Sequence, residues 1–381
     1  MPIVAKKIHV LQVVHSLVIG GTERVVCDLV RAFNNNEFQT SVCCIDALGE
    51  FGQDLLTESF GVEVLGRRPG VDISLIGRLK ALYKRWNVDI VHAHQYTPYF
   101  YAASAALFAG RLPVIFTEHG RHYPDFVRPR RAVMNRALRL TTAACTGVSE
   151  FTKQSLVSFE KMPPERIRVI YNGIWTEVGG GPSTVDRGAL RKSFGLEATD
   201  RLVLSIGRMD PVKDFETLIK AFARTANEVP EARLWIAGGG NTEYQKKLEN
   251  LAKELGIGEK VTLPGSRRDV QDLLAACDVF VLCSITEATS MTILEAMRAG
   301  KAAIATRTGG NPELVLDDET GLLVDVGGIA ALSDAMVRLL RDEKLRQRLG
   351  QAGRIRLEER FSMERILPQY RRLYLEAYGR Q

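Results

Sequence analysis

Glu287 and Glu295 lie eight positions apart in the segment 284–300, a spacing that allows both to contact one ligand. The segment follows an apolar run, 278–283, that is typical of a buried parallel strand, and a helical pattern begins near Thr292. We therefore predict Glu287 in a loop at a strand end and Glu295 one turn inside a helix. Since the first N–H groups of a helix have no partner within it, this helix start should attract an anion. A carboxylate on each side of an anion suits a phosphorylated sugar, with one acid for sugar hydroxyls and the other for a ribose.

Two basic residues follow another predicted strand, 202–207. Gly207 permits a turn there, and Arg208 and Lys213 can converge beyond the strand end. Two fixed cations would stabilise the charge that develops on a diphosphate when a sugar leaves its nucleotide. The alternative is a pair of surface cations beside a turn. Together with the acidic pair, these residues predict a binding site for a phosphorylated sugar.

The two motifs resemble those of the family 4 retaining glycosyltransferases, which have the GT-B fold. The Glu-x7-Glu segment ends in Leu-Glu-Ala-Met-x-Ala-Gly, and Gly207-Arg208-x4-Lys213 matches the family's Gly-Arg-x4-Lys motif. Gly309-Gly-Asn-Pro-Glu313 resembles its Gly-Gly-x-x-Glu loop, whose glycines let the backbone approach a ligand closely. The resemblance covers nearly the whole chain. It implies an α/β fold of two Rossmann-like, doubly wound domains that face a central cleft.

Residue roles follow from this resemblance. In the family, a histidine at the place of His119 faces the donor sugar, with its main-chain carbonyl close to the anomeric carbon. The glycine loop that Gly20-Gly21 resembles contacts the diphosphate, and the backbone near 265–267 meets the base. The resemblance thus implies a catalytic group of His119, Arg208, Lys213 and Glu287. It implies a donor-binding group of Gly20, Gly21, Gly207, Ser266, Arg267, Thr289, Ser290, Met291, Thr292 and Glu295.

Some residues stand outside the motifs or depart from them. His92 and His94 end another predicted strand and could line the acceptor cleft, although histidines that merely pack are the more ordinary outcome. Ala288 occupies a place where glycine is frequent, Trp175 stands where Asn-Gly-Ile usually continues to Asp, and Lys301-Ala302 replaces a frequent x-Pro pair. The first and third departures lie near the donor loop or its helix, so they bear on which sugar is bound and not on the reaction.

Alternating strand and helix patterns organise the chain around these residues. The predicted strands are 8–14, 40–45, 62–65, 89–93, 113–118, 143–148 and 168–171 in the first half and 202–207, 233–237, 260–263, 278–283, 302–306 and 321–324 in the second. This alternation is typical of doubly wound parallel sheets that bind ligands at the carboxyl ends of their strands. The glycine-rich run 179–183 indicates a flexible break. We predict domains at 1–176, joined by a closing helix at 362–381, and at 177–361.

Composition limits the class of protein. The 381 residues, 45% hydrophobic and 25% charged, are typical of a globular protein with two domains. No apolar run is long enough to span a bilayer, and the N-terminus carries no signal-peptide pattern. The six cysteines lack metal-type spacing and lie mostly in apolar runs, so we expect buried, reduced thiols in a cytoplasmic protein. No Asp-x-Asp motif is present to hold a diphosphate through a divalent metal, so we expect no metal and no cofactor, with the nucleotide-sugar as co-substrate.

The net charge of +6 lies entirely in the first half. Residues 1–176 hold 21 of the 51 Lys and Arg and 15 of the 45 Asp and Glu, so the remainder carries 30 of each. Six arginines lie within 121–139, interleaved with aromatic and apolar residues. We hypothesise that this run adsorbs to the anionic inner face of a membrane as a peripheral contact. The alternative is a helix that packs Val133 and Leu140 into the domain and leaves the arginines solvated.

The first hypothesis is therefore a retaining, metal-independent hexosyltransferase. It would move a sugar from a UDP- or GDP-sugar to a glycan or lipid-linked acceptor in polysaccharide or glycoconjugate biosynthesis. The resemblance implies front-face attack, in which the departing phosphate takes the acceptor's proton. Alternatives are a GT-B nucleotide-sugar epimerase, a non-catalytic sugar-nucleotide-binding subunit, and an ordinary strand–loop–helix unit whose acids merely favour the helix start. A dinucleotide oxidoreductase is disfavoured because no Gly-x-Gly-x-x-Gly follows the first strand, and no nucleic-acid partner is expected.

Overall fold

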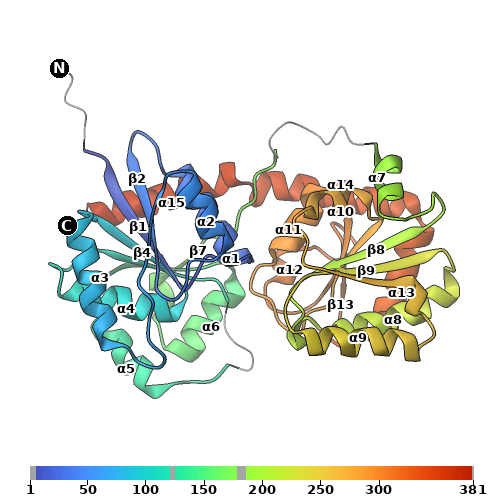
Figure 1. Cartoon of the computed structure of the whole chain (residues 1–381), viewed down its shortest axis with the longest axis horizontal. Coiled ribbons are helices and arrows are strands. Elements are labelled where there is room, and N and C mark those ends of the chain that lie inside the picture. The colour runs from blue at the N-terminus through green and yellow to red at the C-terminus, as the bar shows by residue number, and fades with distance from the viewer. Residues whose placement is uncertain (1–5, 121–124, 178–185, 380–381) are drawn as a thin grey trace. The chain divides into compact units, whose positions relative to one another are not determined.

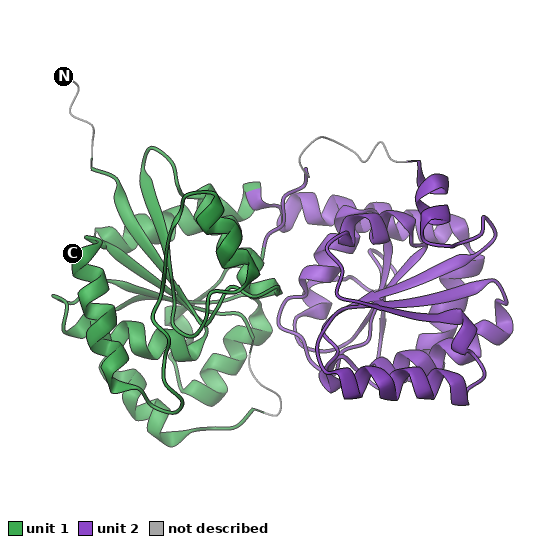
Figure 2. Cartoon of the chain, viewed as in Figure 1, with its two compact units in different colours: residues 1–172, 364–381 green, residues 173–363 purple. Residues whose placement is uncertain are grey.

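The computed structural model describes residues 6–120, 125–177 and 186–379, which form two compact units. Unit 1 comprises residues 1–172 and 364–381, and unit 2 comprises residues 173–363 (Figure 2). The predicted boundaries differ from these by four residues at the first junction and by two at the second. The predicted break at 179–183 and the first four residues of the basic run, 121–124, lie outside the described residues.

Unit 1 is built on a seven-stranded parallel sheet in the order β3-β2-β1-β4-β5-β6-β7 (Figure 1). Its strands are β1 (Ile8–Val14), β2 (Phe38–Cys44), β3 (Gly61–Val64), β4 (Ile90–His94), β5 (Val114–Glu118), β6 (Thr142–Gly147) and β7 (Ile167–Val169). Its helices are α1 (Gly21–Ala32), α2 (Glu50–Thr57), α3 (Ile73–Arg85), α4 (Tyr96–Leu107), α5 (Pro129–Leu138), α6 (Glu150–Glu160) and the closing helix α15 (Met363–Tyr378). The strand order reverses between β1 and β4, and such a switch point leaves a crevice at the carboxyl ends of the two strands.

Aromatic packing and a hydrogen bond anchor α15 to unit 1. The buried ring of Tyr374 meets Phe33 and Phe38 edge-on, with centroids 4.9 and 5.8 Å away. Its hydroxyl accepts a hydrogen bond from Gln12 Nε2 of β1 at 3.1 Å. The last helix of the chain thus completes the core of the first unit.

Unit 2 has a six-stranded parallel sheet in the order β10-β9-β8-β11-β12-β13, which reverses between β8 and β11. Its strands are β8 (Arg201–Ile206), β9 (Ala232–Ala237), β10 (Val261–Gly265), β11 (Val279–Leu282), β12 (Ala302–Thr306) and β13 (Leu322–Val324). Its helices are α7 (Arg187–Ser193), α8 (Phe215–Glu228), α9 (Thr242–Glu254), α10 (Val270–Ala276), α11 (Met291–Arg298), α12 (Asn311–Leu314), α13 (Ile329–Arg341) and α14 (Glu343–Arg360). Both units therefore share one topology.

The sequence predictions of secondary structure are confirmed. All thirteen predicted strands are present, and their ends differ from the prediction by at most two residues. The central strands, such as β1, β8, β11 and β12, are nearly continuous apolar runs because they are buried on both faces, whereas the edge strands β3 and β10 are not. All six cysteines are buried free thiols, as expected.

Candidate active site

Glu287 and Lys213 meet at the switch point of unit 2. Lys213 lies in the connection after β8, and Glu287 lies in the loop after the adjacent strand β11. Lys213 Nζ donates to Glu287 Oε1 at 2.5 Å, and Ser284 Oγ donates to the same oxygen at 2.7 Å. Both members of the ion pair are mostly buried, so water screens their attraction only in part. The fold thus joins two predicted catalytic residues that lie 74 positions apart in the sequence.

Gly207 makes room for this lysine. A Cβ at position 207 would lie 3.4 Å from both Cδ and Cε of Lys213, which is tighter than most contacts of a real Cβ. Arg208, in contrast, is exposed and makes no hydrogen bond or ion pair with any residue that the structure describes. The predicted pair of cations is therefore split between one that holds Glu287 and one that is turned to solvent.

The loop after β12 holds Glu287 by its backbone. Gly310 N donates to the Glu287 carbonyl at 3.0 Å, and Gly309 has a φ of +54°. A Cβ on Gly309 would lie only 1.7 Å from that carbonyl oxygen. We predicted that these glycines would let the backbone approach a ligand, and the contact that Gly309 permits here is with the backbone of Glu287. Thr308 Oγ1 adds a hydrogen bond to the Ile285 carbonyl at 2.8 Å.

The start of α11 forms the anion-attracting end of the same loop. Ser290 caps the helix, because its Oγ accepts from Ile293 N at 3.3 Å. Thr289 and Ser290 are buried, whereas Met291 and Thr292 in the first turn are half-buried. Glu295 is half-buried one turn further along the helix, as predicted. The positive end of the helix dipole and the ion pair of Glu287 and Lys213 therefore belong to one loop–helix segment.

The predicted base-contacting loop lies at the other side of β8. Gly238 N donates to the Gly265 carbonyl at 2.8 Å, and a Cβ on Gly239 would lie 3.3 Å from Ser266 Cβ. Arg267 forms a two-pronged ion pair with Asp269, which lowers the pKa of that carboxyl and raises the pKa of Arg267. Its guanidinium is thus already paired within its own loop.

Sequence reasoning missed the glycine run 238–240 beside that loop. A Cβ on Gly238 would lie 1.8 Å from the Gly207 carbonyl, and Met209 N donates to the Gly239 carbonyl at 2.8 Å. The run therefore keeps the loops after β8 and β9 in contact. Three consecutive glycines directly after the predicted strand 233–237 were the available signal.

In unit 1, His119 follows β5 and ends a chain of buried hydrogen bonds. His119 Nε2 lies 2.8 Å from His94 Nδ1, and His94 Nε2 lies 2.7 Å from Gln12 Oε1. His92 bonds Tyr374 Oη and Thr117 Oγ1 at 3.0 and 2.7 Å. His92 and His94 are therefore buried residues of a polar network, and Gln12 and Tyr374, which the sequence did not indicate, connect them.

The direction of this chain sets the protonation of His119. Gln12 Nε2 donates to Tyr374, so Gln12 Oε1 accepts from His94 Nε2, and neutral His94 then accepts at Nδ1 from His119 Nε2. Burial lowers the pKa of His92 and His119 to about 3 and that of His94 well below its usual value, so all three rings are neutral at pH 7. His119 Nδ1 is left as a buried acceptor without a partner among the described residues. A hydroxyl or N–H group of a ligand would satisfy it.

Gly20 and Gly21 lie at the start of α1, after β1 at the switch point of unit 1. Gly20 is the N-cap, in an extended conformation with φ −168°. A Cβ there would lie 2.3 Å from Glu23 Oε2, so the glycine allows that carboxylate to fold back over the helix start. The predicted diphosphate loop therefore carries an acid at its surface, which the sequence argument had left out.

Helix α5 carries the described part of the basic run. Val133 and Leu140 are 69% and 64% exposed, so the alternative in which they pack into the domain is wrong. The helix is held instead by Asn135 and Leu138, which are buried, and by an ion pair of 3.1 Å between Arg131 and the carboxylate of Glu160. Exposed apolar side chains thus lie next to exposed arginines on α5.

Metal-ion clusters and membrane-spanning helices are both absent from the described residues. In the ranges 6–120, 125–177 and 186–379, no group of three or more His, Cys, Asp or Glu side chains is placed to hold a metal ion. Over the same ranges, no helix has the length and apolar character needed to cross a membrane.

Two family models match adjoining parts of the chain. The family described as Glycosyltransferase Family 4 matches residues 19–178, and the family described as Glycosyl transferases group 1 matches residues 186–356. The first match covers most of unit 1 and the second most of unit 2.

Curated relatives align over most of their length. The N-acetyl-alpha-D-glucosaminyl L-malate synthase of Bacillus anthracis is 29% identical over 313 residues, which are 81% of this chain and 80% of the relative. The UDP-Gal:alpha-D-GlcNAc-diphosphoundecaprenol alpha-1,3-galactosyltransferase of Escherichia coli is 26% identical over 386 aligned residues, which cover 97% of each chain.

Solved structures share the fold. A glycosyltransferase from Rickettsia africae ESF-5 superposes with a TM-score of 0.87 at 20% identity, covering 98% of this chain and all of that one. Anabaena Alr3699/HepE, in complex with UDP-glucose, superposes with a TM-score of 0.81 at 23% identity, covering 96% and 98%. The predicted GT-B fold is confirmed.

Proposed function

The chain belongs to the group 1 glycosyl transferases of glycosyltransferase family 4, and from this premise we propose that it is a retaining hexosyltransferase. It takes a sugar from a UDP- or GDP-sugar and transfers it to a glycan or lipid-linked acceptor in polysaccharide or glycoconjugate biosynthesis. We propose further that the diphosphate is held without a metal ion.

The pairing of Lys213 with Glu287 beside the start of α11 is the observation that carries this proposal. An ammonium group has three N–H donors, so Lys213 keeps its bond to Glu287 while it donates to a phosphate oxygen. Glu287 then accepts hydrogen bonds from sugar hydroxyls. The pair of Lys213 and Glu287 thus contacts both the diphosphate and the sugar that is attached to it. Glu295, one turn further on, is assigned to the ribose.

The proposed reaction exchanges two bonds on one face of the sugar. The bond between the anomeric carbon and the diphosphate oxygen breaks, and the electron pair leaves with the diphosphate. Arg208, Lys213 and the first N–H groups of α11 stabilise the negative charge that develops there. The acceptor oxygen bonds to the anomeric carbon from the same face, and its proton passes to the departing phosphate. His119 contributes its main-chain carbonyl near the anomeric carbon and a neutral ring with a free acceptor nitrogen.

The names of similar proteins support this choice of substrates. The E. coli relative is named for UDP-Gal as donor and for a diphosphoundecaprenol-linked acceptor. The Anabaena structure was solved with UDP-glucose. These names favour a nucleotide-sugar donor and a lipid-linked acceptor for this chain.

A donor and acceptor panel tests the proposal against its alternatives. The protein is incubated with UDP- and GDP-sugars, with and without polyprenyl-diphosphate-linked sugars, and nucleoside diphosphate release is measured together with the anomeric configuration of the product. Acceptor-dependent release with an α-linked product from an α-linked donor supports a retaining transferase. Isomerisation of the donor alone would indicate the epimerase, and binding without release would indicate the non-catalytic subunit.

Glu295 and Glu287 should affect different steps, because the first is assigned to the ribose and the second to the sugar of the donor. Glu295→Gln is expected to weaken the binding of free nucleoside diphosphate by about 10- to 100-fold, because a hydrogen bond to a charged group contributes about 1.5–3 kcal/mol. Glu287→Gln should lower turnover with intact donor by a similar factor and affect the affinity for the free nucleotide less, because its proposed partner is the sugar. Calorimetry with the nucleoside diphosphate and steady-state kinetics separate the two. Equal losses of nucleotide affinity in both variants would contradict the assignment.

Turnover should not depend on a divalent metal. Excess chelator is expected to leave the rate unchanged, because Arg208, Lys213 and the start of α11 supply the positive charge at the diphosphate, and the sequence has no Asp-x-Asp motif. The assay must detect product directly so that no coupling enzyme is inhibited. Complete loss of turnover that Mg²⁺ or Mn²⁺ restores would show that a metal holds the diphosphate.

We propose that the exposed face of α5 adsorbs to anionic membrane. Val133 and the exposed arginines Arg130 and Arg136 present apolar and basic side chains together, the pattern of a helix that lies in a membrane interface. Arg131 is not part of this face, because it is paired with Glu160. A peripheral contact would hold the enzyme near a lipid-linked acceptor.

Membrane adsorption should depend on these arginines. Replacing both Arg130 and Arg136 with serine is expected to lower the partition onto phosphatidylglycerol vesicles about 30-fold, since each basic residue near an anionic surface contributes about 1 kcal/mol. The control is the pair Lys253→Ser and Lys344→Ser, which removes the same charge from exposed positions of unit 2. Vesicle sedimentation at low and high salt measures the effect. If both double variants lost vesicle binding equally, net charge alone would explain the binding, and the proposal that α5 contacts the membrane would be wrong.

A further inference from the structure

A cavity of about 490 Å³ lies in unit 1 at the amino-terminal edge of its sheet. It adjoins Pro113, just before β5, and the first residues of β6 and β7, Thr142 and Ile167. His119 follows the other end of β5, so the length of that five-residue strand, about 17 Å, separates the cavity from the proposed catalytic histidine. Nothing in the proposed transfer reaction uses this edge.

A mismatch in strand length creates the cavity. β6 has six residues, but β7 has only three and begins opposite Cys145. The first three residues of β6, 142–144, therefore border the cavity where a longer β7 would lie. They are half-buried, unlike the end of the same strand.

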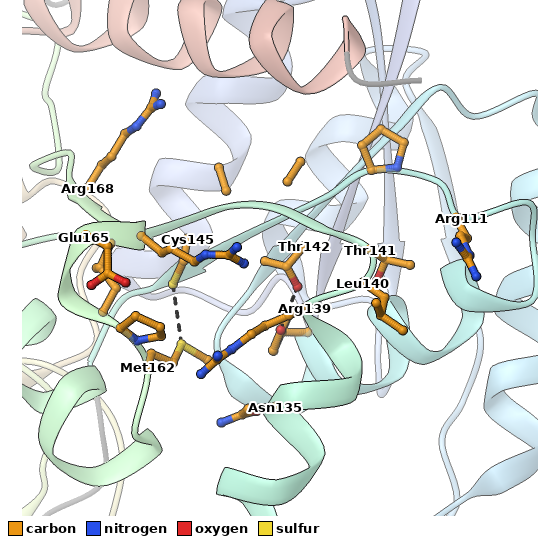
Figure 3. Close-up of a pocket in the computed structure, with 17 residues that line it drawn as sticks. Arg111, Asn135, Arg139, Leu140, Thr141, Thr142, Cys145, Met162, Glu165 and Arg168 are labelled. Carbon is orange, nitrogen blue, oxygen red and sulfur yellow. Dashed lines mark hydrogen bonds between the residues drawn. The ribbon is translucent and has the colours of Figure 1, made fainter.

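The lining is strongly basic. It contains Arg111, Arg139, Arg166 and Arg168 against one acid, Glu165. Arg111 lies at one end of the lining and Glu165 and Arg168 at the other, with Arg139 between them (Figure 3). Arginine stays charged at any physiological pH, so the local potential is positive throughout that range.

The charges are not all used within the protein. Arg168 is paired with Glu376 at 2.7 Å, and Arg139 donates to the Lys161 carbonyl at 3.4 Å. The guanidinium groups of Arg111 and Arg166 make no hydrogen bond or ion pair with any residue in the described part of the chain. Arg111, Arg166 and Arg168 are exposed, and Glu165 and Glu376 are the acids near the group. Four arginines against these two acids leave an excess of positive charge, which favours an anionic ligand.

We propose that this cavity binds the phosphate group of a phosphate ester through Arg111, Arg139 and Arg166. Guanidinium groups match phosphate oxygens with two parallel hydrogen bonds, which makes arginine the side chain best suited to this anion. The volume is in the range of small-molecule sites and far exceeds a bare phosphate, so room is left for an organic group. Met162, Leu140 and Pro163 give that group an apolar wall. The cavity is lined by residues of unit 1, whereas Lys213 and Glu287 belong to unit 2, and the proposal does not rest on the proposed function.

NMR signals of methionine methyl groups report separately on ligand binding at the cavity and at the proposed donor site. Met162 lines the cavity and its sulfur lies 3.7 Å from Cys145 Sγ. In unit 2, Met209 follows Arg208, and Met291 begins α11 in the proposed donor site. In protein labelled at the methionine methyl carbons, glycerol 3-phosphate should shift the Met162 signal, assigned with Met162→Leu. It should leave the Met209 and Met291 signals in place at concentrations that saturate Met162.

Arginine variants test whether the phosphate ester binds through the proposed side chains. Arg166→Ser and Arg111→Asn should each weaken binding at Met162 about tenfold, the effect of losing a hydrogen bond to a charged group. Arg111 has a φ of +62°, a conformation that asparagine tolerates better, so Arg111→Asn should not unfold the protein. Lys80→Ser removes the same charge from an exposed position of α3 and should change nothing. No shift of Met162, or a shift that the arginine variants leave intact, would show an adventitious ion only and overturn the proposal.

A second arm distinguishes the source of the phosphate. Binding of short-chain phosphatidylglycerol about tenfold tighter than that of glycerol 3-phosphate would assign the site to a lipid headgroup. This source fits the position of Leu140, which is exposed beside the α5 surface. Equal affinities would assign it to a free phosphate ester. Either result supports the site, and the failure of donor turnover would leave both unaffected.

Discussion

Replacing Lys213 with methionine is expected to lower turnover at saturating donor by about 10²–10³-fold. One preorganised charge that stabilises a departing group contributes about this much to catalysis. Methionine keeps an unbranched stem against Gly207 and removes only the ammonium, so the packing of the loop is preserved. The variant also leaves the carboxylate of Glu287 unpaired near the diphosphate, where it repels the departing charge.

Arg208→Ala provides the matched comparison. It should cost a similar factor in turnover but leave the melting temperature unchanged, because Arg208 is exposed and bonds no other described residue. Lys213→Met should lower both turnover and the melting temperature, because its partner is mostly buried. Steady-state kinetics and thermal unfolding of the two proteins, followed by the double variant Lys213→Met/Glu287→Gln, measure these effects. Near-native turnover in both single variants would falsify the assignment of the diphosphate-binding cations.

Gly309→Ala is expected to displace Glu287 and to destabilise unit 2. The new Cβ would lie 1.7 Å from the Glu287 carbonyl oxygen, so the loop that carries this acid must move. The φ of +54° costs about 1–2 kcal/mol for a residue with a side chain, and overpacking adds about 1–3 kcal/mol. We expect the free energy of unfolding to fall by about 3 kcal/mol and turnover to fall to a small fraction of the wild-type value.

Gly300→Ala separates the cost of the positive φ from the cost of overpacking. Gly300 has a similar φ, +64°, but nothing lies within 4 Å of the place of its Cβ. It should therefore lose only the conformational term of about 1–2 kcal/mol and keep its turnover. Chemical denaturation and kinetics of both variants give the comparison. If the two alanine variants were equally stable and equally active, the contact between Gly309 and Glu287 would have no role in placing the acid.

The sequence by itself determined the elements and their order. Thirteen apolar runs of strand length, separated by helical patterns, identified every strand of both sheets to within two residues. For the central strands this worked because burial on both faces requires continuous apolar sequence, which is a local property. The end of each strand then placed motif residues such as Gly207 and Glu287 in loops at one edge of a sheet, as parallel strands dictate.

Pairings between distant loops were decided by the tertiary structure. The partner of Lys213 depended on which strand lies beside β8. The sheet order places β11 there, so the loop after β11 brings Glu287 to Lys213. The contact of Gly309 with the Glu287 carbonyl arose in the same way between the loops after β11 and β12. Sequence spacing carries no information on such contacts, since they join loops that are separated by whole strand–helix units.

The tertiary structure also decided which side chains are exposed to solvent. The pattern of α5 allowed Val133 to face either the core or solvent, and packing gave the buried places to Asn135 and Leu138. The protonation of His119 likewise depends on Gln12 and on Tyr374, which are 362 positions apart in the chain. The basic cavity exists because β7 is shorter than β6, a difference between two strands whose effect appears only where they lie side by side. In each case the chain specifies the residue types locally, and the free energy of the whole packed unit selects which of them meet.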